Sequence, residues 1–411
     1  MTSQQQAPAS GTGRWLLVLI LTAILSQTTL NLVRPVTTYK LLTLNAGSVM
    51  VGITTAVYAI LPLAVALWLG RISSRVRQIR YLMLWGILLI VLGSALIGGA
   101  PTIPLVAAGS AVLGLGHLVF TIGGQSSIAR FFPDNQLDKA FGWFTAAFAV
   151  GQVIGPLVAG GILGASTQVA VSERAADVNL SLWIGAAASA LAIPLLMPNL
   201  QPRRIGKPQK VTASAAPEAK QASVGAILRT PGVASHMFAG LALLSMIDIL
   251  TAFLPLVAEH YGVAPAAVGV LLAVRGAASV ISRMFLPWFS RHLNRSRLVL
   301  GSLYGTGLSF ILVPLLLEHL LLASAILFIG GFLMGLGQPL TMSMVSTAVA
   351  FQDRGTALAV RLMGNRVGQV LIPVAASSAA VLVGPGGAIW FCCALLCVSG
   401  IEKSLRSRRE L

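Results

Sequence analysis

Asp248 is the only acidic residue that we place well inside an apolar segment of this sequence, the segment near residues 234–257. A charged side chain at such a position is costly to bury and is normally turned toward a cavity or a partner. A buried carboxylate can take up and release a proton, so we interpret Asp248 as a candidate proton-coupling residue. The alternative is a static ion pair between Asp248 and either Arg34 or Arg275.

Arginines outnumber this buried acid. Arg34, Arg275 and Arg366 also fall within apolar segments. An uncompensated guanidinium that faces a cavity favours a carboxylate or a phosphate as its partner. The three side chains therefore predict an anionic or zwitterionic substrate rather than a lipophilic cation. For Arg366, contact with backbone carbonyls at a helix end, or with a water-filled vestibule, is the alternative.

Uncharged polar residues recur at helical spacing in the same segments. One helical face holds Gln27, Asn31, Arg34 and Thr38, and another holds Arg361, Asn365 and Gln369. From these stripes and their neighbours we predict substrate contacts at Asn31, Tyr58, His117 and Asn365, in addition to the three arginines. His117 is also a candidate second proton site, because the ordinary pKa of histidine lies near neutrality. Packing within the helix bundle is the alternative for Tyr58 and His117.

The segments that carry these residues are long and apolar. Hydrophobic residues make up 56% of the 411 residues and charged residues 9%, which is too little charge for a soluble protein. A membrane-spanning helix needs about 20 predominantly apolar residues. We predict an all-α membrane protein with twelve such helices, near residues 15–37, 48–69, 81–100, 103–128, 140–163, 179–197, 234–257, 266–289, 298–317, 320–346, 357–383 and 387–402.

The twelve helices fall into two sets of six. The predicted division is a tail (1–13), an N-terminal bundle (14–197), a basic flexible linker (198–232), a C-terminal bundle (233–402) and a second tail (403–411). Basic residues concentrate in the linker, in the second tail and in the loops after the second and eighth spans, which places both tails in the cytoplasm. The net charge of +17 therefore reflects membrane topology, and we expect no nucleic-acid partner.

An internal repeat relates the two bundles. A single constant offset in residue number, which we call the repeat offset, carries Tyr58 onto Arg275 and Asn31 onto Asp248. The same offset carries Val51-Gly52 onto Val268-Gly269, Gly151-Gln152 onto Gly368-Gln369 and Pro156 onto Pro373. One offset that links three pairs of spans indicates a duplicated architecture rather than a coincidence of composition.

A glycine-rich apolar stretch stands out in the fifth span, with Gly142, Gly151, Gly155 and Gly160 and an embedded Pro156. Small residues at such spacing let two membrane helices approach closely. The pattern resembles the fifth-helix motif of the major facilitator superfamily, specifically that of its proton-coupled exporters. This resemblance implies two parallel six-helix repeats, with the substrate site near the middle of the bilayer between them.

Two loops extend the resemblance. The stretch from Gly70 to Arg77 after the second span, which includes Arg75, and its counterpart from Arg283 to Arg297 resemble the gating loops of the superfamily, although Ser74 stands where the family usually has an aspartate and Arg77 where it has a glycine. In the fourth span, Ser110 occupies the place where proton-coupled drug exporters usually carry an arginine. These departures leave the predicted fold unchanged, and they argue against the standard proton relay of the exporters.

We therefore predict a secondary transporter that works by alternating access, and we expect proton-coupled export of an anionic or amphipathic compound. Uptake of a carboxylate-like nutrient by proton symport and general multidrug export are the alternatives. The sequence has no P-loop, no HExxH and no Gly-x-Ser-x-Gly, so we expect neither an enzyme nor ATP-driven transport by this chain.

The expected setting is the bacterial cytoplasmic (inner) membrane. We expect a monomer whose partners are a small-molecule substrate, a proton and the lipid bilayer, with no cofactor and no metal. Cys392, Cys393 and Cys397 share one apolar run, and we interpret them as packing residues rather than metal ligands.

Overall fold

The computed structural model describes residues 12–76, 78–132, 134–164, 174–198, 200, 224–350 and 353–409. Within these residues the chain forms fourteen α-helices and no β-strand, which confirms the predicted all-α class. The first half of the chain contains α1 (Thr12–Thr43), α2 (Ser48–Arg75), α3 (Ile79–Gly99), α4 (Ile103–Phe131), α5 (Asp134–Leu163), α6 (Ala175–Ala190) and α7 (Ala192–Leu196). The second half contains α8 (Val224–Arg229), α9 (Val233–His260), α10 (Pro265–His292), α11 (Arg295–Ile311), α12 (Leu320–Thr347), α13 (Arg354–Val383) and α14 (Gly387–Arg409).

Eleven helical segments in this part of the chain are long and apolar enough to cross a membrane, with α6 and α7 counted together as one. Long apolar segments become helices in a bilayer because each backbone group must find its hydrogen-bond partner within the segment. Of the twelve predicted spans, the ninth is shorter than expected, because the 17 residues of α11 end at Ile311. Pro314 disfavours helical backbone at the residue before it. The chain continues through turns to Leu317, so the predicted regular helix is wrong in residues 312–317.

Several boundaries differ from those predicted. The helix α2 continues through Arg75 and α10 continues through His292, so Gly70 and Arg75 lie in the last turns of α2 rather than in a loop. Arg283 lies within α10, as its predicted span implies. Each helix is closed by a backbone hydrogen bond from the residue after it, as from Val76 to the carbonyl of Ile72. The predicted tail from residue 403 is helical to Arg409 in α14. Residues 1–11 of the first tail, and 199 and 201–223 of the linker, lie outside the described residues.

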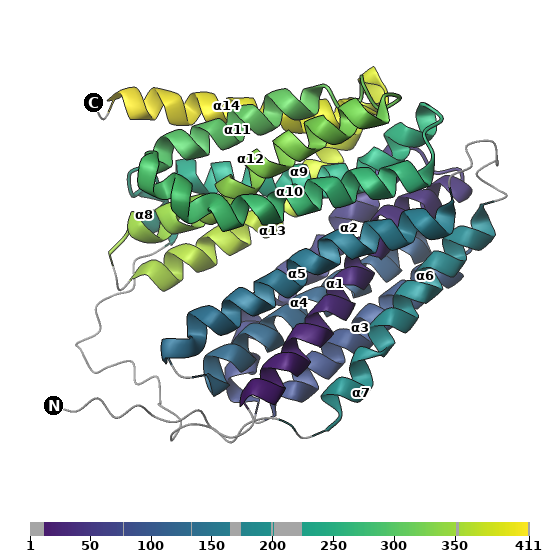
Figure 1. Ribbon diagram of the computed structural model, residues 1–411, viewed down its shortest axis with the longest axis horizontal. Helices are drawn as coiled ribbons and strands as arrows, with labels where there is room; N and C mark the ends of the chain where they lie inside the picture. The colour runs from purple at the N-terminus through teal and green to yellow at the C-terminus, as the bar shows by residue number, and fades with distance from the viewer. Residues whose placement is uncertain are drawn as a thin grey trace.

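The helices form two groups, α1–α7 and α8–α14, which lie at an angle to one another (Figure 1). We call the end of the molecule at which α1 begins and α14 ends the terminal end, toward the left in Figure 1, and the opposite end the far end. Across the boundary α5 packs against α10, α2 against α13 and α1 against α9. The first two of these contacts are exchanged by the repeat offset, since it carries α2 onto α10 and α5 onto α13.

The contacts between the halves repeat at the level of single residues. A methyl group added at Gly52 would overlap the carbonyl oxygen of Pro373, and one added at Gly269 would overlap that of Pro156. The repeat offset carries Gly52 onto Gly269 and Pro156 onto Pro373. The same two glycine–proline contacts therefore hold both sides of the interface, as a pseudo-twofold relation between the halves requires.

The glycines of the fifth-helix motif differ in their surroundings. A Cβ atom at Gly155 would lie 2.6 Å from the carbonyl oxygen of Thr28, and one at Gly151 would lie 2.5 Å from the Cβ atom of Gln27. These two glycines therefore set the close approach of α5 to α1. At Gly142 an added Cβ atom has no neighbour within 4 Å.

We expect Gly155→Ala to destabilise the protein by about 1–3 kcal/mol, because overpacking forces backbone or side chains to shift. Thermal unfolding of the purified protein in detergent measures the effect. Gly142→Ala is the matched control in the same helix and should be neutral or slightly stabilising, since alanine is the better helix former. A Gly155→Ala protein as stable as the control would show that α1 and α5 can separate without cost.

Candidate functional site

An ion pair joins the two halves in the middle of the molecule. Arg34 Nη2 on α1 donates to Asp248 Oδ1 on α9 at 2.6 Å, and the side chains are 19% and 6% exposed. The second carboxylate oxygen of Asp248 accepts from Gln369 Nε2 on α13 at 2.9 Å. Of the two pairings expected from the sequence, the structure therefore has the one with Arg34.

The network continues along α13. Arg366 Nη1 donates to Gln369 Oε1 at 2.9 Å, so Gln369 links Arg366 to Asp248. Asn365 is buried on the same helix, one turn before Gln369. None of the hydrogen bonds in the described part of the chain connects Asn365 to this network, so the structure brings together Arg366 and Asp248 but leaves Asn365 beside them.

On the side of the N-terminal half, the network passes through an aromatic ring. The guanidinium carbon of Arg34 lies 4.9 Å from the centroid of the Tyr58 ring, a cation–π contact. Tyr58 Oη and His117 Nδ1 are 2.6 Å apart, and His117 Nε2 lies 3.3 Å from Gln27 Nε2. Asn31 instead donates to the carbonyl of Gln27 within its own helix, at 2.8 Å. Four helices, α1, α2, α4 and α9, thus place Arg34, Tyr58, His117 and Asp248 in one connected cluster.

Gln27 and Gln369 complete this cluster, although neither was among the predicted site residues. Both side chains are uncharged amides, so neither shows the feature that identified the arginines and Asp248, which is a charge inside an apolar segment. The available signal was spacing, because Gln27 precedes Asn31 by four residues and Gln369 follows Asn365 by four. In each half, therefore, a polar residue one helical turn from a predicted site residue belongs to the site.

Arg275 is a buried arginine that the network does not satisfy. It is 3% exposed on α10, and its Nε and Nη1 atoms are buried with no hydrogen-bond partner in the described part of the chain. Its backbone lies against Gly331 of α12, where an added Cβ atom would be 2.7 Å from the carbonyl oxygen of Arg275. A buried donor without a partner is costly, and more so when it is charged. The arrangement therefore leaves an electropositive group in need of an anion.

The predicted gating residues lie apart from this cluster. Arg283 is exposed on α10, about two helical turns beyond Arg275 toward the terminal end. Gly70 and Arg75 lie at the same end of α2, and the side chain of Arg75 is outside the described part of the structure. None of the three is joined to the ion pair by a hydrogen bond among the described residues.

A small cavity adjoins the ion pair on the side of the far end. It has a volume of about 20 Å³. The residues that line it are Arg34, Thr37, Thr38, Leu41, Val51, Thr54, Thr55, Tyr58, Ser110, Leu113, Thr251 and Ala252. The hydroxyl of Thr54 is buried here and has no partner within the described residues. The cavity is lined by hydroxyl groups as well as by apolar side chains, and it has room for about one water molecule.

The two halves are also held together at the wall of this cavity and farther toward the far end. Thr38 Oγ1 on α1 donates to the carbonyl of Ala252 on α9 at 2.7 Å. Arg174 Nη1, just before α6, lies 3.0 Å from Glu259 Oε2 near the end of α9. These contacts close the interface between the central ion pair and the far end.

We expect Glu259→Gln to loosen this closure. A partly exposed ion pair contributes up to about 1 kcal/mol, so the open population should rise by up to about fivefold. The measurement is the rate at which a hydrophilic maleimide labels Thr38→Cys in the purified protein, with and without Glu259→Gln. Glu318→Gln removes an exposed acid elsewhere and should leave the rate unchanged. Equal rates in all three proteins would mean that the pair with Arg174 does not hold the far end closed.

Comparison with known proteins identifies a family model that matches most of the chain. The sequence matches the family model described as Major Facilitator Superfamily over residues 10–318 and 237–406. The MFS-type transporter TwmF of Talaromyces wortmannii is 31% identical over 147 residues, which is 35% of this chain. That match spans only 25% of the length of TwmF.

Solved structures of transporters share the fold over almost the whole chain. A mutant of the nucleoside transporter NupG has a TM-score of 0.78 at 12% identity and covers 95% of this chain and 99% of its own. The D-xylose-proton symporter has a TM-score of 0.76 at 14% identity, with 96% and 97% covered. A bacterial homologue of the human lysosomal transporter Spinster, in an inward-facing and occupied conformation, has a TM-score of 0.73 at 16% identity, with 96% and 97% covered. At these identities the similarity concerns the fold alone.

Proposed function

Since the chain belongs to the Major Facilitator Superfamily, we propose that it is a proton-coupled secondary transporter of a small organic anion. The observation that carries this proposal is the pairing of Arg34 with Asp248 across the two halves, together with the buried Nε and Nη1 atoms of Arg275, which have no hydrogen-bond partner among the described residues. Asp248 of the ion pair is a group that can accept a proton, and Arg275 provides a site for an anion.

Proton binding and anion binding are linked through Arg34 in this proposal. When Asp248 takes up a proton, Arg34 loses its charged partner and becomes available to a carboxylate or phosphate of the substrate. The same step removes the ion pair that ties α1 to α9. Each ligand therefore raises the affinity of the site for the other, as linkage requires.

This linkage favours symport as the direction of coupling. Because the proton and the anion stabilise each other's binding, they cross the membrane together, and a proton gradient then drives uptake of the anion. The geometry thus favours the alternative of carboxylate uptake over the export that we expected from the sequence. Export by antiport is the second candidate, supported by the resemblance of the fifth helix to proton-coupled exporters, and multidrug export is the third.

The state of the transporter follows from the contacts between its halves. The far end is held by the contact of Thr38 with Ala252 and by the pair of Arg174 with Glu259. The basic residues of the second tail support a cytoplasmic location for the terminal end. We infer that this conformation faces the cytoplasm, in a monomer in the bacterial inner membrane.

A flux assay in proteoliposomes with an entrapped pH dye tests the proposal. Organic anions and lipophilic cations are offered separately, with an inward or an outward proton gradient. We expect organic anions to drive saturable proton movement in the same direction as the anion. Proton movement opposite to the anion would support antiport, and movement driven by cations alone would indicate a multidrug exporter. Absence of proton movement with either panel would contradict proton coupling.

A further inference from the structure

An apolar groove lies on the surface of the C-terminal half, between α10 and α12. It has a volume of about 550 Å³ and is lined by Phe285, Trp288, Phe289 and Phe332. Phe289 of α10 and Phe332 of α12 meet edge to face with their ring centroids 6.1 Å apart, so both helices contribute to its wall. Phe285 and Trp288 are 51% and 56% exposed. In a membrane, such a surface contacts lipid chains.

Basic side chains lie where the groove approaches the terminal end. The His292 ring lies tilted against Trp288, with the ring centroids 4.8 Å apart. Arg295, the first residue of α11, donates from Nη1 to Ser343 Oγ on α12 at 3.2 Å. Ser343 follows Phe332 by eleven residues, about three helical turns, so the two share one face of α12. We call His292, Arg295 and the adjacent Arg291 the basic cap of the groove.

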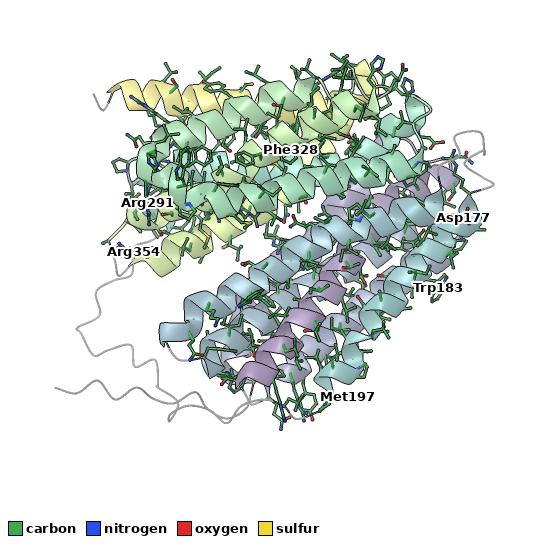
Figure 2. The ribbon with its side chains drawn as sticks, in the orientation of Figure 1. Asp177, Trp183, Met197, Arg291, Phe328 and Arg354 are labelled. Carbon is green, nitrogen blue, oxygen red and sulfur yellow. The ribbon has the colours of Figure 1, made fainter. Side chains whose placement is uncertain are left out.

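We propose that the groove and its basic cap bind one anionic phospholipid. The acyl chain lies against the four aromatic rings, and the phosphate lies at the basic cap. Arg291 is exposed at the terminal end of α10, the end opposite to Asp177 (Figure 2). The sequence from residue 283 to residue 297 contains four arginines and no acid, so the charge around the groove is positive.

The charge of the head group decides between lipids. An anionic head group gains from the positive charge of each arginine near the membrane surface, whereas a zwitterionic head group carries its own cation and gains little. The aromatic wall would accept the chain of either lipid. The structure therefore predicts selection by charge rather than by chain, and this selection is independent of the transport activity proposed above.

Quenching of tryptophan fluorescence by brominated lipids tests the proposal, because Trp288 lines the groove. The full-length protein is reconstituted in phosphatidylcholine bilayers that contain dibrominated phosphatidylglycerol or dibrominated phosphatidylcholine. The contribution of Trp288 is the difference between wild type and Trp288→Phe. We expect quenching of Trp288 to show a preference of about fivefold or more for the anionic lipid.

Three double variants locate the source of this preference. Arg291→Gln combined with Arg295→Gln should abolish the preference for the anionic lipid. Arg291→Lys combined with Arg295→Lys should keep the preference, which would also show that the fold tolerates substitution at these positions. Arg229→Gln with Arg354→Gln removes two exposed arginines on other helices at the terminal end and should keep the preference. Equal quenching by both lipids in wild type would overturn the proposal. The proposal would also be overturned if the preference survives the loss of Arg291 and Arg295. It would likewise be overturned if replacing Arg229 and Arg354 removes the preference to the same extent as replacing Arg291 and Arg295.

Discussion

Asp248→Asn is expected to abolish proton-driven accumulation of the substrate, with a loss of about 100-fold or more. Asparagine preserves the shape of the side chain but accepts no proton near neutral pH, so Arg34 loses its charged partner permanently. The measurement is accumulation of the anion in proteoliposomes under an imposed proton gradient. Exchange of substrate across the membrane without a gradient should continue, because it needs the anion site but no net movement of protons.

The same substitution should destabilise the protein. Removing one partner of a buried ion pair leaves an uncompensated charge, at a cost of about 3–5 kcal/mol. The exposure of Arg34, 19%, places the expected loss near the lower end of that range. Thermal unfolding in detergent measures it. Arg34→Gln combined with Asp248→Asn removes both charges and should recover most of the stability without recovering accumulation.

The control for both measurements is Asp177→Asn, which neutralises an exposed acid of α6 at the far end. It should change neither accumulation nor unfolding. If Asp248→Asn still accumulates the anion against its gradient, Asp248 is a structural partner of Arg34 and the coupling proton binds elsewhere. His117 would then be the next residue to replace, because it is the titratable group joined to the network through Tyr58.

The fold could be predicted from sequence because its determinants are local or repeated. Apolar length specified the spans, and the repeat offset identified equivalent positions, of which Gly52 and Gly269 prove to make equivalent contacts with Pro373 and Pro156. The helix ends were less predictable. Residues such as Arg75 are polar enough for a loop, yet each can extend a helix by another turn beyond the apolar span. A single proline, Pro314, ends α11 before the apolar run is complete.

The charged members of the candidate site were predictable from the sequence, whereas its uncharged amides and its pairings were not. Charge inside an apolar segment is rare enough to mark Arg34, Asp248 and Arg275 individually. The choice of Arg34 over Arg275 as the partner of Asp248 depends on how α1, α9 and α10 meet, which no local pattern encodes. Gln369 lacks a charge, so its role in linking Asp248 to Arg366 becomes visible only once α13 is placed against α9.

Arg275→Gln should weaken binding of the anionic substrate by about 10- to 100-fold, seen as a rise in KM. A hydrogen bond to a charged group contributes about 1.5–3 kcal/mol. The Nε and Nη1 atoms of Arg275 have no hydrogen-bond partner among the described residues, so they can form such bonds with a bound anion. Arg275→Lys keeps the charge but loses the planar fork, so we expect an intermediate KM. Initial rates of anion uptake measure the effect, with Arg297→Gln, an exposed arginine of α11, as the control.

Arg275→Gln should raise the stability of the protein although it lowers the affinity for the anion. Arg275 is a buried charge whose Nε and Nη1 atoms lack partners among the described residues of the substrate-free protein, so replacing it by glutamine removes a desolvation cost and should raise the temperature of unfolding. Asp248→Asn should lower it. Addition of the anion should stabilise wild type, because a ligand that binds only the folded state shifts unfolding by mass action, and this gain should be largely lost in Arg275→Gln. If Arg275→Gln instead lowers stability and leaves KM unchanged, its guanidinium is part of the packing of α10 and the anion must bind to Arg34 or Arg366.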